Sequence, residues 1–185
     1  MGNSTNTSRC HETTRVLGID PGLQLTGFGC VDHRGTRPIA LIDAGVFRFR
    51  PRVEVAARLV ELERDLDALI ASLRPDLACV EALFAHYAHP RTAVTMGHAR
   101  GVILLVLHRA GIPTIEVPAT HAKKALTGNG HASKAQVQHA IQWQLGLPAV
   151  PDPPDVADAL AIALAGLAMH GTPGGRAVRR TVAPE

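Results

Sequence analysis

Residues 15–22 read Arg-Val-Leu-Gly-Ile-Asp-Pro-Gly, a short apolar run that closes with one acid and a Pro-Gly pair. A run of this length is typical of a buried strand, and Pro-Gly is typical of the turn that ends it. Asp20 therefore lies at the edge of a predicted sheet, where a carboxylate is costly to bury unless it is paired or bound to a metal. The alternative is an Asp that only helps to form the turn, and this stretch alone leaves both open.

The segments after this strand first continue the strand pattern and then change to helical spacing. Residues 25–32 and 38–49 are strand-like and are separated by a turn, so the first three strands form an antiparallel meander. Two later strands, at 77–81 and 112–117, alternate with helices predicted at residues 53–73, 92–110, 121–126, 133–145 and 155–170. This order predicts an α/β fold with a five-stranded mixed sheet, three antiparallel strands and then two parallel ones, and helices on both faces.

Length and composition limit the class of protein. The chain has 185 residues, 46% hydrophobic and 19% charged, which is ordinary for one globular domain. We expect a disordered leader at 1–14, the domain at 15–170 and a flexible tail at 171–185. No uncharged run reaches the roughly 18 residues that span a membrane, and the start has no signal-peptide pattern. These features favour a soluble, cytoplasmic protein. The chain has three scattered cysteines, Cys10, Cys30 and Cys79, and their spacing indicates neither a disulfide framework nor a zinc site.

Three further acids extend the arrangement at Asp20. Glu81 closes another apolar strand, and two acids at one edge of a sheet converge on the crevice where open α/β sheets bind ligands. Asp155 and Asp158, three residues apart at the start of the last helix, lie on one face of it. Asp155 has a structural alternative, because acids stabilise helix N-termini. Four carboxylates favour Mg²⁺ or Mn²⁺, and two such ions can stabilise the attacking and leaving oxygens of a phosphodiester displacement.

The lysines are confined to one part of the chain. Only three of the 19 lysines and arginines are lysines, and Lys123, Lys124 and Lys134 all lie within twelve residues. A GC-rich genome explains why lysine is scarce but not why it is clustered. Lys134 opens one predicted helix and Lys123 lies near the start of another, so both can meet a phosphate or a departing oxyanion. The net charge of +3 by itself neither demands nor excludes a nucleic-acid partner.

Five motifs occur in one order and spacing along the chain. They are VLGIDPG at 16–22, VEALF at 80–84, GHARG at 97–101, KAQVQH at 134–139 and DVADALAIA at 155–163. Together they resemble the bacterial RuvC family of Holliday-junction resolvases. The resemblance implies an RNase H-like fold, a homodimer, and cooperation with the RuvA and RuvB branch-migration proteins. It also implies an endonuclease of recombination and DNA repair that nicks four-way junction DNA symmetrically, leaving 5′-phosphate and 3′-hydroxyl ends.

The resemblance assigns expected roles to individual residues. By position, the four acids match the family's metal ligands and two lysines match basic residues near the scissile phosphate, which gives a catalytic set of Asp20, Glu81, Asp155, Asp158, Lys123 and Lys134. Phe84 matches an aromatic that the family places against the bases at the crossover, with core packing as the alternative. We further expect Tyr87 to add a second stacking face, and Arg91 and Lys124 to contact DNA.

Two features depart from the family pattern. The loop from 84 to 92 is about one residue longer than usual, which affects the contacts expected at the junction. His98 stands where the family commonly has Gln, and we expect a contact at the helix surface or a dimer interface rather than metal binding. Cys30 and Cys79, both in predicted strands, are expected to be core residues.

Three other functions compete with the resolvase. A related RNase H-like nuclease acting on structured ribosomal RNA precursors shares the first strand motif, but lacks a segment like residues 80–84. An actin-like kinase also opens with Asp-x-Gly, but its fold needs two such domains. A catalytically silent junction-binding module would be expected to have lost one or more of the four acids, and all four are present.

Overall fold

The computed structural model describes residues 13–50, 52–82 and 90–171, apart from the side chains of 90–92 and 171. Its five strands form one sheet in the order β3-β2-β1-β4-β5. β1 pairs antiparallel with β2, and β2 with β3, whereas β4 runs parallel to both β1 and β5. The predicted mixed sheet is therefore confirmed, with strands β1 Thr14–Asp20, β2 Leu25–His33, β3 Ala40–Arg48, β4 Leu77–Glu81 and β5 Thr114–Val117.

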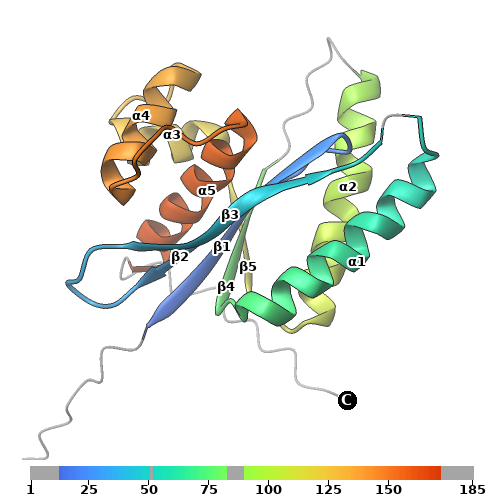
Figure 1. Ribbon diagram of the computed structural model, residues 1–185, viewed down its shortest axis with the longest axis horizontal. Coiled ribbons are helices and arrows are strands. Elements are labelled where there is room, and N and C mark those ends of the chain that lie inside the picture. The colour runs from blue at the N-terminus through green and yellow to red at the C-terminus, as the bar shows by residue number, and fades with distance from the viewer. Residues whose placement is uncertain (1–12, 51, 83–89, 172–185) are drawn as a thin grey trace, which may run out of the picture.

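Helices cover both faces of this sheet, as predicted (Figure 1). Two of them, α1 Val55–Leu73 and α2 Pro90–Arg109, cover one face, where a buried cluster joins them to β1 and β4. On the other face α5 Pro154–Gly171 lies directly on the strands, and α3 Ala119–Thr127 and α4 Lys134–Leu145 pack outside α5. In the part of the chain that the structure describes, no helix is both long and apolar enough to cross a membrane.

Several element ends differ from the prediction, for local reasons. α2 begins at Pro90 and α5 at Pro154, earlier than expected, because proline is well suited to the first position of a helix. β5 begins two residues later than expected. The amide of Ile112 donates to the carbonyl oxygen of Leu107 at 3.0 Å, so this residue closes the end of α2 instead of joining the strand.

Arg15 ties four elements together at the end of the sheet where β1 begins. Its guanidinium donates to both carboxylate oxygens of Asp32 on β2, at 2.7 and 3.0 Å, and to the carbonyl oxygen of Leu73 at 2.6 Å, where α1 ends. Its backbone amide donates to Asp76, just before β4, at 2.8 Å. The two-pronged pair on Asp32 has a charge-assisted geometry that is stronger than an ordinary hydrogen bond.

This ion pair makes the stability of the fold depend on pH. The hydrogen bond from Arg15 lowers the pKa of Asp32 below its usual value. Such a group contributes stability above the pKa of the unfolded chain, near 4, and that stability is lost as the pH falls through the lower folded pKa. We expect Asp32→Asn to lower the free energy of unfolding at pH 7 by about 1–3 kcal/mol, with a smaller difference at pH 3. Urea unfolding curves of both proteins across this range test it; parallel pH profiles would contradict it.

Candidate active site

The alternation of side chains along two strands directs two acids to the same face. On β1, Leu17 and Ile19 pack toward α1 and α2, whereas Val16 packs toward α5. Because side chains alternate between the faces of a strand, Asp20 shares the face of Val16. On β4, Leu77 and Cys79 likewise belong to the buried cluster that contains the residues of α5. Glu81 is the next alternate residue of this strand, so its side chain lies on the same face. Both acids therefore end neighbouring strands on the α5 side, as the sequence predicts.

Glycines let α5 approach the sheet and bring its acids to the same place. A Cβ atom at Gly27, the residue of β2 that pairs with Asp20, would overlap the backbone carbonyl of Asp155. A Cβ at Gly18 would similarly overlap the backbone of α5 at Ala159. The first turn of α5, which carries Asp155 and Asp158, thus lies directly beside the end of β1. No sequence pattern alone showed that these contacts fix the helix.

The charges of the other three acids act on Asp20. Burial, a hydrogen bond with Glu81 and the charges of Glu81, Asp158 and Asp155 together raise the pKa of Asp20 to about 9, with burial the largest cause. Burial also raises the pKa of Asp158, while Lys134 and Lys123 act to lower it. The site therefore concentrates partly buried negative charge that nearby cations only partly balance.

The side chains of the four acids are of the kind that binds a divalent cation. Carboxylate oxygens are the ligands that Mg²⁺ and Mn²⁺ prefer, and positive charge would relieve the repulsion that raises the pKa of Asp20. Within the described residues, no three His, Cys, Asp or Glu side chains converge closely enough to hold an ion as they stand. Carboxylates without a counter-ion repel one another and stay apart. To bind a divalent cation, these side chains would have to turn toward a common point.

Two of the three lysines face this site. Lys134 is the first residue of α4, and its Nζ lies 4.0 Å from the Oδ2 of Asp158. A capping box fixes this end of α4: the amide of Gln136 donates to Ser133 Oγ at 3.3 Å, and the amide of Ser133 donates to Gln136 Oε1 at 2.8 Å. Lys123, on α3, also acts on the pKa of Asp158.

Lys124 differs from these two lysines. Successive residues of a helix point about 100° apart, and Lys124 is exposed on α3 next to Lys123. The structure therefore brings Lys123 and Lys134 to the acids and leaves Lys124 on the outer surface.

Arg100 is a residue of this region that sequence reasoning missed. Its Nε donates to the backbone carbonyl of Glu81 at 3.4 Å, and its Nη2 lies 2.6 Å from Glu116 Oε1 on β5. It thereby fastens α2 to the ends of β4 and β5, where Glu81 enters the site. Arg100 lies within the motif at 97–101, which was the available signal, but nothing in the motif indicated this contact.

The remaining candidates fall in different places. Phe84 and Tyr87 lie outside the described residues, and so does the side chain of Arg91, although its backbone belongs to α2. His98 is exposed on α2, in agreement with a helix-surface role. The structure describes two cysteines, Cys30 and Cys79. Both are buried and free, as expected of core residues.

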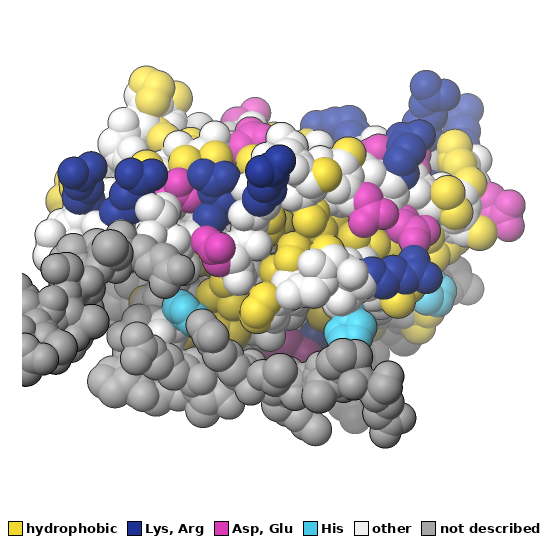
Figure 2. All heavy atoms as spheres, turned by 90° about the horizontal axis from the view of Figure 1, so that it is seen from below, with side chains coloured by type: hydrophobic (Ala, Val, Ile, Leu, Met, Phe, Trp, Pro, Cys, Tyr) yellow, Lys and Arg dark blue, Asp and Glu magenta, His cyan; other side chains and the backbone are white. Residues whose placement is uncertain are grey.

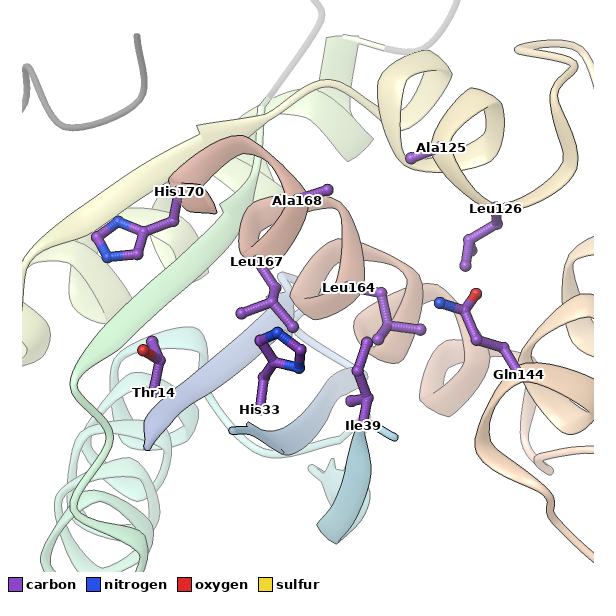
Figure 3. A pocket seen from close by; sticks show the side chains of 10 residues that line it. All are labelled: Thr14, His33, Ile39, Ala125, Leu126, Gln144, Leu164, Leu167, Ala168 and His170. Atoms are coloured by element: carbon purple, nitrogen blue, oxygen red, sulfur yellow. The ribbon is translucent and has the colours of Figure 1, made fainter. Parts of the chain in front are cut away.

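A cavity of about 350 Å³ lies away from the acids. Its lining includes Thr14 at the start of β1, His33 at the end of β2 and Leu167 near the end of α5, and none of the four acids (Figure 3). The cavity is therefore separate from the acidic site.

Figure 2 shows the molecule from below in the orientation of Figure 1, with hydrophobic side chains in the middle and a row of lysine and arginine side chains near one edge.

Comparison with known proteins decides the family. A family model for crossover junction endodeoxyribonuclease RuvC matches residues 16–166. The chain belongs to the RuvC family. The crossover junction endodeoxyribonuclease RuvC of Rhodopirellula baltica is 44% identical over 173 residues, which cover 94% of this chain and 97% of that protein. The RuvC of Synechococcus sp. (strain WH7803) is 43% identical and covers 82% of this chain and 97% of its own. The expected enzyme class, a crossover junction endodeoxyribonuclease, is thus confirmed.

Solved structures agree with this assignment to the RuvC family. The RuvC of T. thermophilus, solved in complex with a Holliday junction substrate, is 32% identical, with a TM-score of 0.78 over 83% of this chain and 93% of that chain. The yeast mitochondrial Holliday junction resolvase Ydc2 shares the fold, with a TM-score of 0.61 at 14% identity. The RNase H-like fold is confirmed, and membership of RuvC implies a need for a divalent metal. The resolvase is favoured over the structured-RNA nuclease, the kinase and the silent module.

Proposed function

We propose that this protein resolves Holliday junctions in recombination and DNA repair, in the cytoplasm, by paired symmetric nicks that leave 5′-phosphate and 3′-hydroxyl ends. The observation that carries the proposal is the electrostatic interaction of Asp20 with Glu81, Asp155 and Asp158, in a RuvC-family chain. A nuclease of this kind needs such a concentration of carboxylates and a source of positive charge beside it.

The four acids would hold two Mg²⁺ or Mn²⁺ ions, which supply Lewis-acid stabilisation of the attacking and leaving oxygens. Asp20 interacts with all three other acids, so it would be the central ligand of this set. Glu81 completes the set from β4, and Asp155 and Asp158 complete it from α5. The Nζ groups of Lys134 and Lys123 lie on the α3–α4 side, where they would meet the phosphate or the departing oxyanion.

Paired cuts require two active sites. We therefore propose a homodimer, and a functional partnership with the RuvA and RuvB branch-migration proteins. Sedimentation of the purified protein would test the first, with a mass of twice 19.6 kDa expected. A monomer that still makes paired symmetric cuts in one binding event would contradict it.

The direct test of the function uses a labelled synthetic four-way junction beside a linear duplex of the same sequence. We expect symmetric nicks in the junction alone, and DNA ligase should seal the products because their ends are 5′-phosphate and 3′-hydroxyl. Equal cleavage of the linear duplex would contradict structure selectivity. Tight binding without cleavage would favour the silent module, and cleavage of structured RNA alone would favour the ribosomal-precursor nuclease.

Lys134→Ala should slow cleavage by about one or two orders of magnitude, since it removes an electrostatic stabiliser beside the reacting phosphate. The measurement is the single-turnover rate at saturating junction. Lys124→Ala is the matched comparison, because Lys124 is an exposed lysine on α3. It should weaken binding and reduce the salt dependence of affinity by about one phosphate contact, with a smaller effect on the rate. A Lys134→Ala enzyme that cleaves at the normal rate would remove Lys134 from the site.

A further inference from the structure

Arg100 is withdrawn from solvent and contacts the backbone of an active-site acid. Most arginines whose side chains the structure describes are exposed, and the exceptions are Arg15, Arg58 and Arg100. Each of these three donates a hydrogen bond to a backbone carbonyl oxygen, and the acceptors are Leu73, Leu23 and Glu81, respectively. The three side chains therefore hold the backbone instead of presenting their charge to solvent. Of the three acceptors, only Glu81 belongs to the acidic site.

The peptide unit that follows Glu81 is held at both of its polar groups. The Nε of Arg100 donates to the carbonyl oxygen of Glu81 at 3.4 Å, and the amide of Ala82 donates to the carbonyl oxygen of Val117 on β5 at 3.0 Å. Both groups belong to one planar peptide unit, so the two contacts together limit its rotation. The side chain of Glu81 leaves the Cα atom next to this unit. Its direction toward the other acids therefore depends on how the unit is held.

The guanidinium of Arg100 is itself anchored, on the face of the sheet away from the acids. Its Nη2 lies 2.6 Å from Glu116 Oε1, and its side chain is 16% exposed. Val117 packs in the cluster on the α5 face, so Glu116, its neighbour on β5, points to the α2 face. Helix α2 covers that face, opposite α5 (Figure 1). Arg100 thus reaches the end of β4 from behind the acidic site.

We propose that Arg100 is a positioning residue for the metal site. It acts through the backbone of Glu81, with Glu116 as its anchor, and not by contact with the metal. Removal of a group that orients a metal ligand typically lowers metal affinity or activity by about 10–100-fold. An ion pair that only joined α2 to β5 would change the melting temperature and leave the metal affinity of the folded protein as it is. The inference rests on the proposed function, in which Glu81 binds the metal.

The affinity for Mn²⁺, measured without DNA, tests this role. Arg100→Met removes the donors, and Arg109→Met is the matched control on the same helix, because Arg109 is 63% exposed and pairs with Glu63 at 2.8 Å. Isothermal titration with Mn²⁺ should give a dissociation constant about tenfold higher for Arg100→Met than for the wild type. Arg109→Met should leave the constant unchanged. Asp20→Asn, titrated in parallel, assigns the measured heat to the acidic site.

Two further variants and thermal melts in chelator separate positioning from folding. Arg100→Gln repeats the comparison with a polar side chain, in case the methionine variant does not fold. Arg100→Lys keeps a donor and a positive charge, so its Mn²⁺ constant should lie between those of the wild type and Arg100→Met.

Equal Mn²⁺ affinities of the wild type and the folded Arg100→Met or Arg100→Gln protein would overturn the proposal, whatever their melting temperatures. Wild-type Mn²⁺ binding that Asp20→Asn leaves unchanged would instead contradict the proposed metal site, and with it the proposed function.

Discussion

Asp20→Asn is expected to abolish junction cleavage while leaving junction binding largely intact. The substitution removes the carboxylate that interacts with all three other acids, while its size is nearly unchanged. Metal-ion stabilisation of a phosphoryl transfer is worth several kcal/mol, so the rate should fall by roughly a thousandfold or more. Binding depends mainly on phosphate contacts to lysine and arginine, which the change does not touch.

The same substitution should stabilise the metal-free protein. Burial and neighbouring acids raise the pKa of Asp20 to about 9, so the folded state disfavours its charge at neutral pH, and an amide carries none. The melting temperature should rise by roughly 2–4 °C for each kcal/mol gained in a chain of this size. Loss of binding together with cleavage, or a lower melting temperature, would show that Asp20 is a structural residue.

Gly27→Ala is expected to damage both the fold and the chemistry. Its new Cβ would overlap the backbone carbonyl of Asp155, which cannot rotate away, so the first turn of α5 must move. Overpacking of this kind costs about 1–3 kcal/mol of stability. A shift near 1 Å in catalytic groups can cost about a hundredfold in rate, so cleavage should fall even where the protein remains folded.

Gly101→Ala is the matched control for this change. Gly101 lies in α2, and a Cβ there would meet nothing within 4 Å. Alanine favours a helix over glycine, so this variant should melt at an equal or higher temperature and cleave at the normal rate. Denaturant unfolding and single-turnover cleavage of both variants make the comparison. A Gly27→Ala protein as active and stable as Gly101→Ala would show that α5 does not need this close contact.

The acids of the site could be predicted because they interrupt apolar patterns. Asp20 and Glu81 each end a buried strand, and strand alternation carries both to one face. Asp158 lies within an otherwise apolar helix, where a buried charge is costly unless it is paired or bound to a metal. The helices and strands followed from hydrophobic periodicity, with errors only at ends such as Pro90 and Ile112, where local bonding decides the boundary.

The contacts that fix the site could not be read from the chain. Gly27 and Gly18 look like ordinary strand glycines, and only the packing of α5 shows why a side chain has no room there. Arg100 is one of 16 arginines, and its contact with the end of β4 depends on how α2 crosses the sheet. Such contacts join elements far apart in sequence, so no local pattern contains them.

The central claim is that Asp20, Glu81, Asp155 and Asp158 make this protein a metal-dependent junction nuclease, and its most direct test is the metal dependence of cleavage. Single-turnover rates on a four-way junction would be measured over a range of Mg²⁺ and Mn²⁺ concentrations and with chelator. We expect no nicks in chelator, and a rate that rises with either ion more steeply than first order, because two ions are needed. Cleavage that continues undiminished in chelator would contradict the claim.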